Sequence, residues 1–158
     1  MRCSANCHTE SLRIMDELYG HDTAMSLATV NGEKPNLRVV NVYYKDASFY
    51  AITYGLSNKM KEISVNQHVA ICHNLFVAHG LGENLGHPLD EDNRGLREEL
   101  RQAFSAWYEK HVDERDGNTC ILGIKLQDAL VFAHDFKYFI DFEKRTAAKQ
   151  ECVVDIVL

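Results

Sequence analysis

The stretch from residue 25 to residue 54 constrains the fold most strongly, because short runs of strand-favouring residues alternate there with tight turns. Three such runs lie at residues 25–30, 37–44 and 48–54. The first is a short apolar and β-branched stretch, and valine, tyrosine, phenylalanine and isoleucine dominate the other two. Asn31-Gly32, between the first two runs, is the strongest short-range hairpin pattern, and Lys45-Asp46-Ala47 supplies the second turn. The segment is therefore predicted to form a three-stranded antiparallel meander.

The remainder of the chain continues with short strands and inserted helices. Further strands are expected at residues 69–72, 75–85, 120–126, 129–135 and 137–142, and helices at residues 9–19, 57–66 and 90–111. Residues 152–158 are apolar and could add a terminal strand. Short, closely spaced strands are typical of a barrel, and inserted helices leave it split. We therefore predict a mainly β fold with helices, a six-stranded antiparallel split β-barrel, as a single domain over residues 1–158.

Charge and composition exclude several classes of partner. The formal net charge is −6, with a sequence pI of about 5.7, which argues against nucleic acid because a phosphate backbone demands a basic face. No segment approaches the roughly 20 apolar residues of a membrane span, and residues 1–18 lack the apolar core of a signal peptide. We expect a cytoplasmic protein with no membrane partner.

The five cysteines do not suggest a metal site. Cys3 and Cys7 are followed by His8, but a second ligand pair at a suitable spacing is missing, and the spacing does not fit a c-type haem. Cys72 and Cys120 lie within apolar runs and are expected to be small buried side chains. We predict free thiols and no bound metal.

An arginine in the run 37–44 points to an anion. Arg38 stands among apolar residues, where burial of a cation is costly unless it meets a negative charge. The segment 53–59 (TYGLSNK) lies where a predicted strand gives way to a predicted helix. Its hydroxyls, its lysine and the free N–H groups of a helix start favour phosphate. Since the strands that carry Arg38 and Thr53 are neighbours in a meander, both are expected to reach one anion site, with Lys59 as a second cation.

Each of these residues also has a structural explanation. Ser57 can serve only as a helix N-cap, and Lys59 can be a solvated side chain. Arg38 can pair with a structural carboxylate such as Asp22 or Glu83. The combination is more specific than its parts, although anion binding alone does not name the ligand.

Several motifs resemble those of the pyridoxamine 5′-phosphate oxidase-like superfamily of FMN-binding split barrels. That family shows the patterns x-R-x-V, Y-x-T and S-x-K…L…N-P-x-V. They match the strand SLATVNGEKPNLRVVNVYY, the strand FYAITY, the helix start SNKMKEI and Asn66-Gln67-His68-Val69-Ala70, where Gln67 replaces the proline. The resemblance covers residues 25–83 by motif and the later strands by order only.

The resemblance implies a role at the phosphate end of the cofactor for four residues. Arg38 and Lys59 would hold the FMN phosphate, with Ser57 and Asn58 beside them. The short relatives with this pattern include flavin reductases, nitroimidazole reductase-like proteins and general stress proteins.

Five further residues are implied to contact the rest of the cofactor. The backbone of Val39, Val40 and Asn41 would lie along the isoalloxazine ring and bond its polar edge, and Ile52 and Thr53 would contact the ribityl chain or the phosphate. The family forms homodimers with FMN at the interface, so a homodimer is expected here.

The sequence departs from the oxidase proper. Nothing after Phe142 resembles the arginine- and tryptophan-rich segment that closes the oxidase site, and Leu75 stands where the oxidases carry a glutamine. The dimer that the resemblance implies offers Trp107 of the partner subunit as a ring that stacks on the cofactor, but the helical spacing of Trp107 favours a core position. The prediction is an FMN-dependent oxidoreductase acting on a small molecule, with NAD(P)H as a candidate donor and with no catalytic residue identified. The alternative is a non-catalytic protein that binds a flavin, a deazaflavin or haem.

Overall fold

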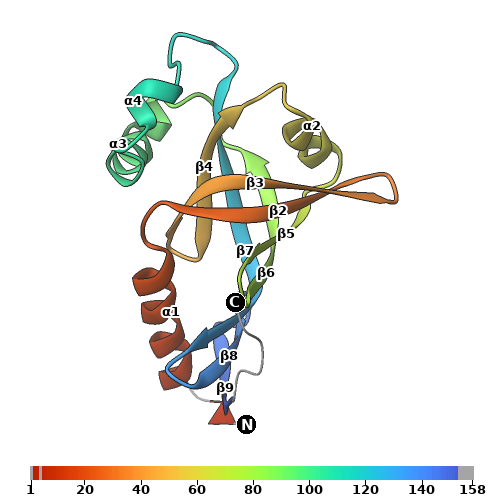
Figure 1. Ribbon diagram of the computed structural model, residues 1–158, viewed down its shortest axis with the longest axis vertical. Coiled ribbons are helices and arrows are strands. Elements are labelled where there is room, and N and C mark those ends of the chain that lie inside the picture. The colour runs from red at the N-terminus through yellow and green to blue at the C-terminus, as the bar shows by residue number, and fades with distance from the viewer. Residues whose placement is uncertain (1, 4, 153–158) are drawn as a thin grey trace.

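The computed structural model describes residues 2–3 and 5–152, and six of its strands close into an antiparallel barrel. These strands are β2 (Thr23–Asn31), β3 (Lys34–Lys45), β4 (Ser48–Tyr54), β5 (His68–His73), β6 (Phe76–Asn84) and β7 (Thr119–Ala133). Their order is β7-β4-β3-β2-β5-β6, and the pairing of β6 with β7 completes the circle. The predicted six-stranded split barrel is therefore confirmed (Figure 1).

A smaller sheet extends from the far end of β7. Its strands are β8 (Phe136–Asp141), β9 (Thr146–Glu151) and the short β1 (Arg2–Cys3), each antiparallel to its neighbour. Helix α1 (Ala5–Tyr19) lies beside this extension in Figure 1 and packs mainly against β9. Its buried side chains include Ile14, Met15 and Tyr19, whereas Leu18 is 38% exposed.

Short helices surround the opposite end of the barrel. Helix α2 (Asn58–Val65) stands on one side of β3 and β4 in Figure 1, and α3 (Arg94–Ala103) and α4 (Tyr108–His111) stand on the other. The 3-10 turn η1 (Glu91–Asn93) precedes α3. In the part of the chain that the structure describes, no helix is long and apolar enough to cross a membrane.

Two apolar clusters hold these elements together. The larger fills the barrel and includes an aromatic group in which Phe49 contacts Tyr19, Tyr44 and Phe76 at ring-centroid distances of 5.4 to 6.0 Å. The smaller cluster joins α3 and α4 to the outside of β4 and β7 through Leu100, Phe104, Tyr108 and Ile121. The helices after β6 are thus fixed to the barrel wall by apolar burial.

The structure corrects two predicted elements. The predicted strands 120–126 and 129–135 are one strand, β7, because polar Gln127 lies at a bulge: Leu126 pairs with Gly80, but Asp128 pairs with His79. The predicted helix 90–111 is interrupted after Ala103, and the break stacks Trp107 on Phe104 with ring centroids 4.7 Å apart.

The end of the chain also differs from expectation. Strand β9, at residues 146–151, was not predicted, because its sequence TAAKQE lacks strand-favouring residues apart from its threonine. The predicted terminal strand at 152–158 falls outside the described residues from position 153 onward.

Candidate functional site

A cavity of about 460 Å³ opens where β3 and β4 separate. The two strands pair only at Tyr43–Lys45 with Ser48–Tyr50, next to the tight turn that joins them. Farther along, residues 39–41 of β3 and residues 51–53 of β4 form opposite walls of the cavity. The remaining lining residues are Lys59, Trp107 and His111. The split in the barrel therefore leaves one backbone edge of β3 free to bond a ligand.

Six of the nine residues predicted to bind the cofactor line this cavity. They are Val39, Val40, Asn41, Ile52, Thr53 and Lys59. The other three lie close to it in the chain: Arg38 precedes the β3 wall, and Ser57 and Asn58 precede Lys59 at the start of α2. The meander and the β4–α2 junction thus bring the predicted set to one region.

Lys59 is a half-buried cation without a carboxylate partner in the described chain. Burial lowers the pKa of its ammonium group, and the nearby Arg38 guanidinium lowers that pKa further. A half-buried lysine that lies near an arginine and has no carboxylate partner of its own in the described chain favours the binding of a negatively charged ligand.

Ser57 adds an unsatisfied hydroxyl at the same place. It is the N-cap residue of α2, but its side chain makes no capping hydrogen bond. Its Oγ atom is buried and has no hydrogen-bond partner among the described residues. Such a group is unfavourable unless a ligand or water satisfies it. The first N–H groups of α2, beginning at Asn58, supply further donors at this point.

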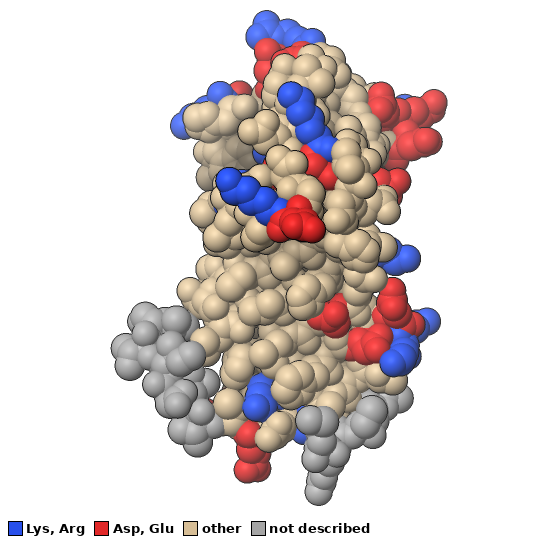
Figure 2. Space-filling model, turned by 90° about the vertical axis from the view of Figure 1, so that its right-hand side faces the viewer, with Lys and Arg blue, Asp and Glu red and all other residues tan. Residues whose placement is uncertain are grey.

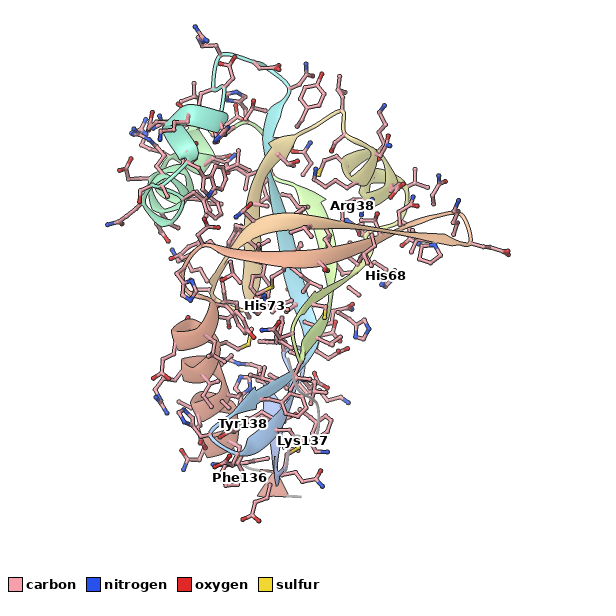
Figure 3. All side chains as sticks on the ribbon, in the orientation of Figure 1. Arg38, His68, His73, Phe136, Lys137 and Tyr138 are labelled. Atoms are coloured by element: carbon pink, nitrogen blue, oxygen red, sulfur yellow. The ribbon has the colours of Figure 1, made fainter. Side chains whose placement is uncertain are left out.

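Arg38 is held by groups of the chain itself. Its Nη1 donates to the Leu27 carbonyl at 3.2 Å and to Thr29 Oγ1 at 2.6 Å, and its Nη2 lies 3.3 Å from Glu62 Oε2. The arginine therefore does have a structural carboxylate partner, which is Glu62 rather than Asp22 or Glu83. Figure 3 shows Arg38 between the β2–β3 ribbon and α2.

Sequence reasoning missed the wall formed by α4. Trp107, which was expected in the core, is half-buried, lines the cavity and donates from Nε1 to Asp22 Oδ2 at 2.7 Å. Asn41 Nδ2 donates to the other oxygen of Asp22 at 2.9 Å. Asp22 thus links two walls of the cavity. His111 is the single histidine among the lining residues.

The described residues contain no cluster of histidine, cysteine or acidic side chains that could hold a metal ion. Cys120 is buried, as predicted, and lies near Lys59, whereas Cys72 is only half-buried. The chemistry available at the cavity is therefore the binding of an anionic, partly apolar ligand by backbone groups, a lysine and an indole ring.

Solved structures with the same fold support this interpretation of the architecture. A candidate pyridoxamine 5′-phosphate oxidase from Listeria innocua is 16% identical over 77% of this chain and 94% of its own, with a TM-score of 0.56. An FAD-binding protein from Mesorhizobium loti is 18% identical over 81% of this chain and 94% of its own, also with a TM-score of 0.56.

A heme-binding protein from Mycobacterium smegmatis is 13% identical over 92% of this chain and 61% of its own, with a TM-score of 0.63. No protein-family model and no curated protein matches the sequence. The class of protein is thus defined by its fold. The chain has the split-barrel fold of the pyridoxamine 5′-phosphate oxidase-like proteins, as the sequence motifs predicted.

Proposed function

We propose that this protein binds a flavin nucleotide, for which the sequence predicts FMN, and uses it as an oxidoreductase acting on a small molecule. The proposal is supported by the place where the gap between β3 and β4 reaches the start of α2. There, the free edge of β3 lines the same cavity as Lys59, whose ammonium group has no carboxylate partner in the described chain. The buried Ser57 hydroxyl, two residues before Lys59, has no partner among the described residues either. These groups suit a ring with a polar edge and an attached phosphate.

The chain's own residues would bind and orient the cofactor. Lys59, Ser57 and the first amides of α2 would hold the phosphate, and the backbone of residues 39–41 would bond the polar edge of the ring. A bound flavin supplies the hydride chemistry. Trp107, fixed by Asp22, would close one side of the cavity and limit access of water to it.

A second copy of the chain would complete the site. Paired residues on the outside of the sheet form an uncharged row across seven strands: Val39, Ser26, Cys72, Val77, Leu130, Phe139 and Ala148. Val39, at one end of the row, is 67% exposed and also lines the cavity. Figure 2 shows a broad region without Lys, Arg, Asp or Glu in the middle of one side. We propose that this face forms the homodimer interface.

The proposal is tested by titrating the protein with FMN. Trp107 is the only tryptophan, so quenching of its emission reports on the cavity alone, while the visible spectrum reports on the flavin. Saturable quenching that is weakened in Lys59→Ala, but not in the matched surface variant Lys61→Ala, supports the site. A protein that ignores FMN and FAD, or that shows a Soret band with haem instead, overturns it.

Catalysis and assembly need separate measurements. Reduction of the bound flavin by NADH or NADPH, followed by reoxidation with an added acceptor, distinguishes an enzyme from a carrier. Solution mass of the flavin-loaded protein tests the dimer, and Val39→Asp should convert it to a monomer because it places a charge in the uncharged row.

A further inference from the structure

A carboxylate lies beside Arg38, one of the residues predicted to hold the phosphate. Glu62, on α2, accepts hydrogen bonds from the Thr29 hydroxyl and from Asn36 Nδ2 at 2.6 Å, and it pairs with Arg38. These bonds, the one from Thr29 foremost, hold the pKa of Glu62 below its usual range. Its side chain is only 10% exposed. Glu62 is therefore a fixed negative charge at neutral pH.

The guanidinium group of Arg38 is already bound by other groups of the chain. Its Nη1 is bonded to Leu27 and Thr29, and its Nη2 is directed at Glu62. An incoming phosphate therefore meets an ion pair rather than an isolated guanidinium group. The positive charge that Arg38 adds to the site is offset by the negative charge of Glu62.

Lys59 remains as the one unbalanced charge. Arg38, Lys59 and Glu62 together carry a single net positive charge. Ser57 Oγ and the first N–H groups of α2 add donors but no further full charge. The electrostatic complement of this cluster is a ligand group with one negative charge.

We propose that the phosphate end of the cavity is matched to a phosphodiester, which carries one negative charge, rather than to a terminal phosphate. The inference rests on the proposed flavin-nucleotide function and specifies its ligand. A terminal phosphate carries a charge of about −1.5 to −2 at pH 7, so its second charge would face Glu62 without compensation. Flavins esterified at the phosphate, as FAD is, belong to the favoured class.

The surface next to this end leaves room for the second ester substituent. Three residues are exposed there: Tyr54 (47%) at the end of β4, Leu56 (52%) in the turn that follows, and Asn58 at the first position of α2. A substituent that leaves the phosphate in this direction reaches solvent past an aromatic and an aliphatic side chain. The fold therefore does not require the phosphate to be the end of the ligand.

The test compares riboflavin, FMN and the methyl ester of FMN, with Trp107 emission as the readout at pH 7.5 and low salt. FMN and its ester differ by one methyl group and one charge. We expect the ester to bind more tightly than FMN. In Glu62→Gln, FMN should gain affinity by about tenfold and the ester by clearly less, because FMN carries the additional charge.

Glu17→Gln is the matched control, because it removes one carboxylate from an ion pair on α1, far from α2 in Figure 1. Tighter binding of FMN than of its ester, or an equal gain for both in Glu62→Gln, overturns the inference while the flavin function stands. Equal affinity for riboflavin, FMN and the ester also overturns it. If none of the three binds, the proposed function itself fails. The affinities of the wild-type protein for FMN and for its ester test the inference even if Glu62→Gln folds poorly.

Discussion

The two ends of the molecule treat their polar groups differently. Beside α1, Tyr138 donates to Glu10 at 2.8 Å, Lys149 donates to the same carboxylate at 2.9 Å, and the ammonium lies 4.1 Å from the centre of the Phe136 ring. Beside α2, Lys59 has no carboxylate and Ser57 Oγ has no partner in the described chain. Figure 3 shows Phe136 and Tyr138 at the end opposite Arg38.

This difference distinguishes polar groups that stabilise the fold from polar groups that are available to a ligand. The Glu10 cluster at the α1 end is self-sufficient, since each of its charged groups has a partner within the chain, and its role is to attach α1 to β8 and β9. The α2 end keeps cationic and hydroxyl groups whose burial is unfavourable until an anion arrives. Removal of a group from the first end should lower stability, whereas removal from the second should lower ligand affinity.

The largest effect is expected at the self-sufficient end. Tyr138 is 1% exposed, so Tyr138→Ala should lower the free energy of unfolding by about 3–5 kcal/mol, as for other buried aromatic side chains. Chemical denaturation measures this loss, and flavin affinity of the folded protein should be unchanged. If Tyr138→Ala kept the stability of the wild type but bound flavin more weakly, the contrast between the two ends of the molecule would be wrong.

At the α2 end, Lys59→Ala should show the opposite behaviour. A charge-assisted contact contributes roughly 1.5–3 kcal/mol, so flavin-nucleotide affinity should fall by about ten- to one-hundred-fold. Stability without ligand should not fall, because burial and Arg38 lower the pKa of Lys59 and make its charge unfavourable in the fold. A Lys59→Ala protein that unfolds more easily, with unchanged affinity, would make Lys59 a structural residue.

The turns and element boundaries that depend on neighbouring residues could be predicted from the sequence. Gly32 adopts φ 62° in the hairpin turn that Asn31-Gly32 indicated, and the passage from strand to helix at Ser57 occurs where expected. Both depend on neighbouring residues alone. Six predicted residues line the cavity because the positions of β3 and β4 in the meander and the position of Lys59 at the start of α2 follow from this local structure.

The long-range pairings could not be predicted. Glu62 meets Arg38 and Thr29 only because α2 packs against β2, which requires the barrel to be closed. Trp107 reaches Asp22, 85 residues away, because the helix breaks after Ala103, and the helical spacing of its apolar residues gave no sign of that break. A double substitution of Arg38→Ala and Lys59→Ala would therefore combine a loss of ligand binding with a loss of the structural Arg38–Glu62 pair.

A smaller effect is expected at Asp22, which joins Trp107 to Asn41. Asp22→Asn can accept only one of the two hydrogen bonds well, because its amide group is itself a donor. We expect flavin affinity to fall by about fivefold, corresponding to roughly 1 kcal/mol, with a shift of Trp107 emission in the free protein. Asp92→Asn, an exposed residue of η1, is the control. An unchanged emission spectrum would show that Asp22 does not hold the indole.

The smallest effect is a pH dependence at the α1 end. The hydrogen bond from Lys149, followed by the one from Tyr138, lowers the pKa of Glu10 in the folded protein. A carboxyl group with a lowered folded pKa stabilises the protein above its unfolded pKa, and that contribution is lost as pH falls through the folded value. The stability of wild type should therefore decline more steeply than that of Glu10→Gln below about pH 4.5. Denaturation at several pH values measures the stability of both proteins. If wild type and Glu10→Gln lose stability in parallel as pH falls, the charge of Glu10 does not contribute to folding. The contrast with Lys59 would then depend on ligand binding alone.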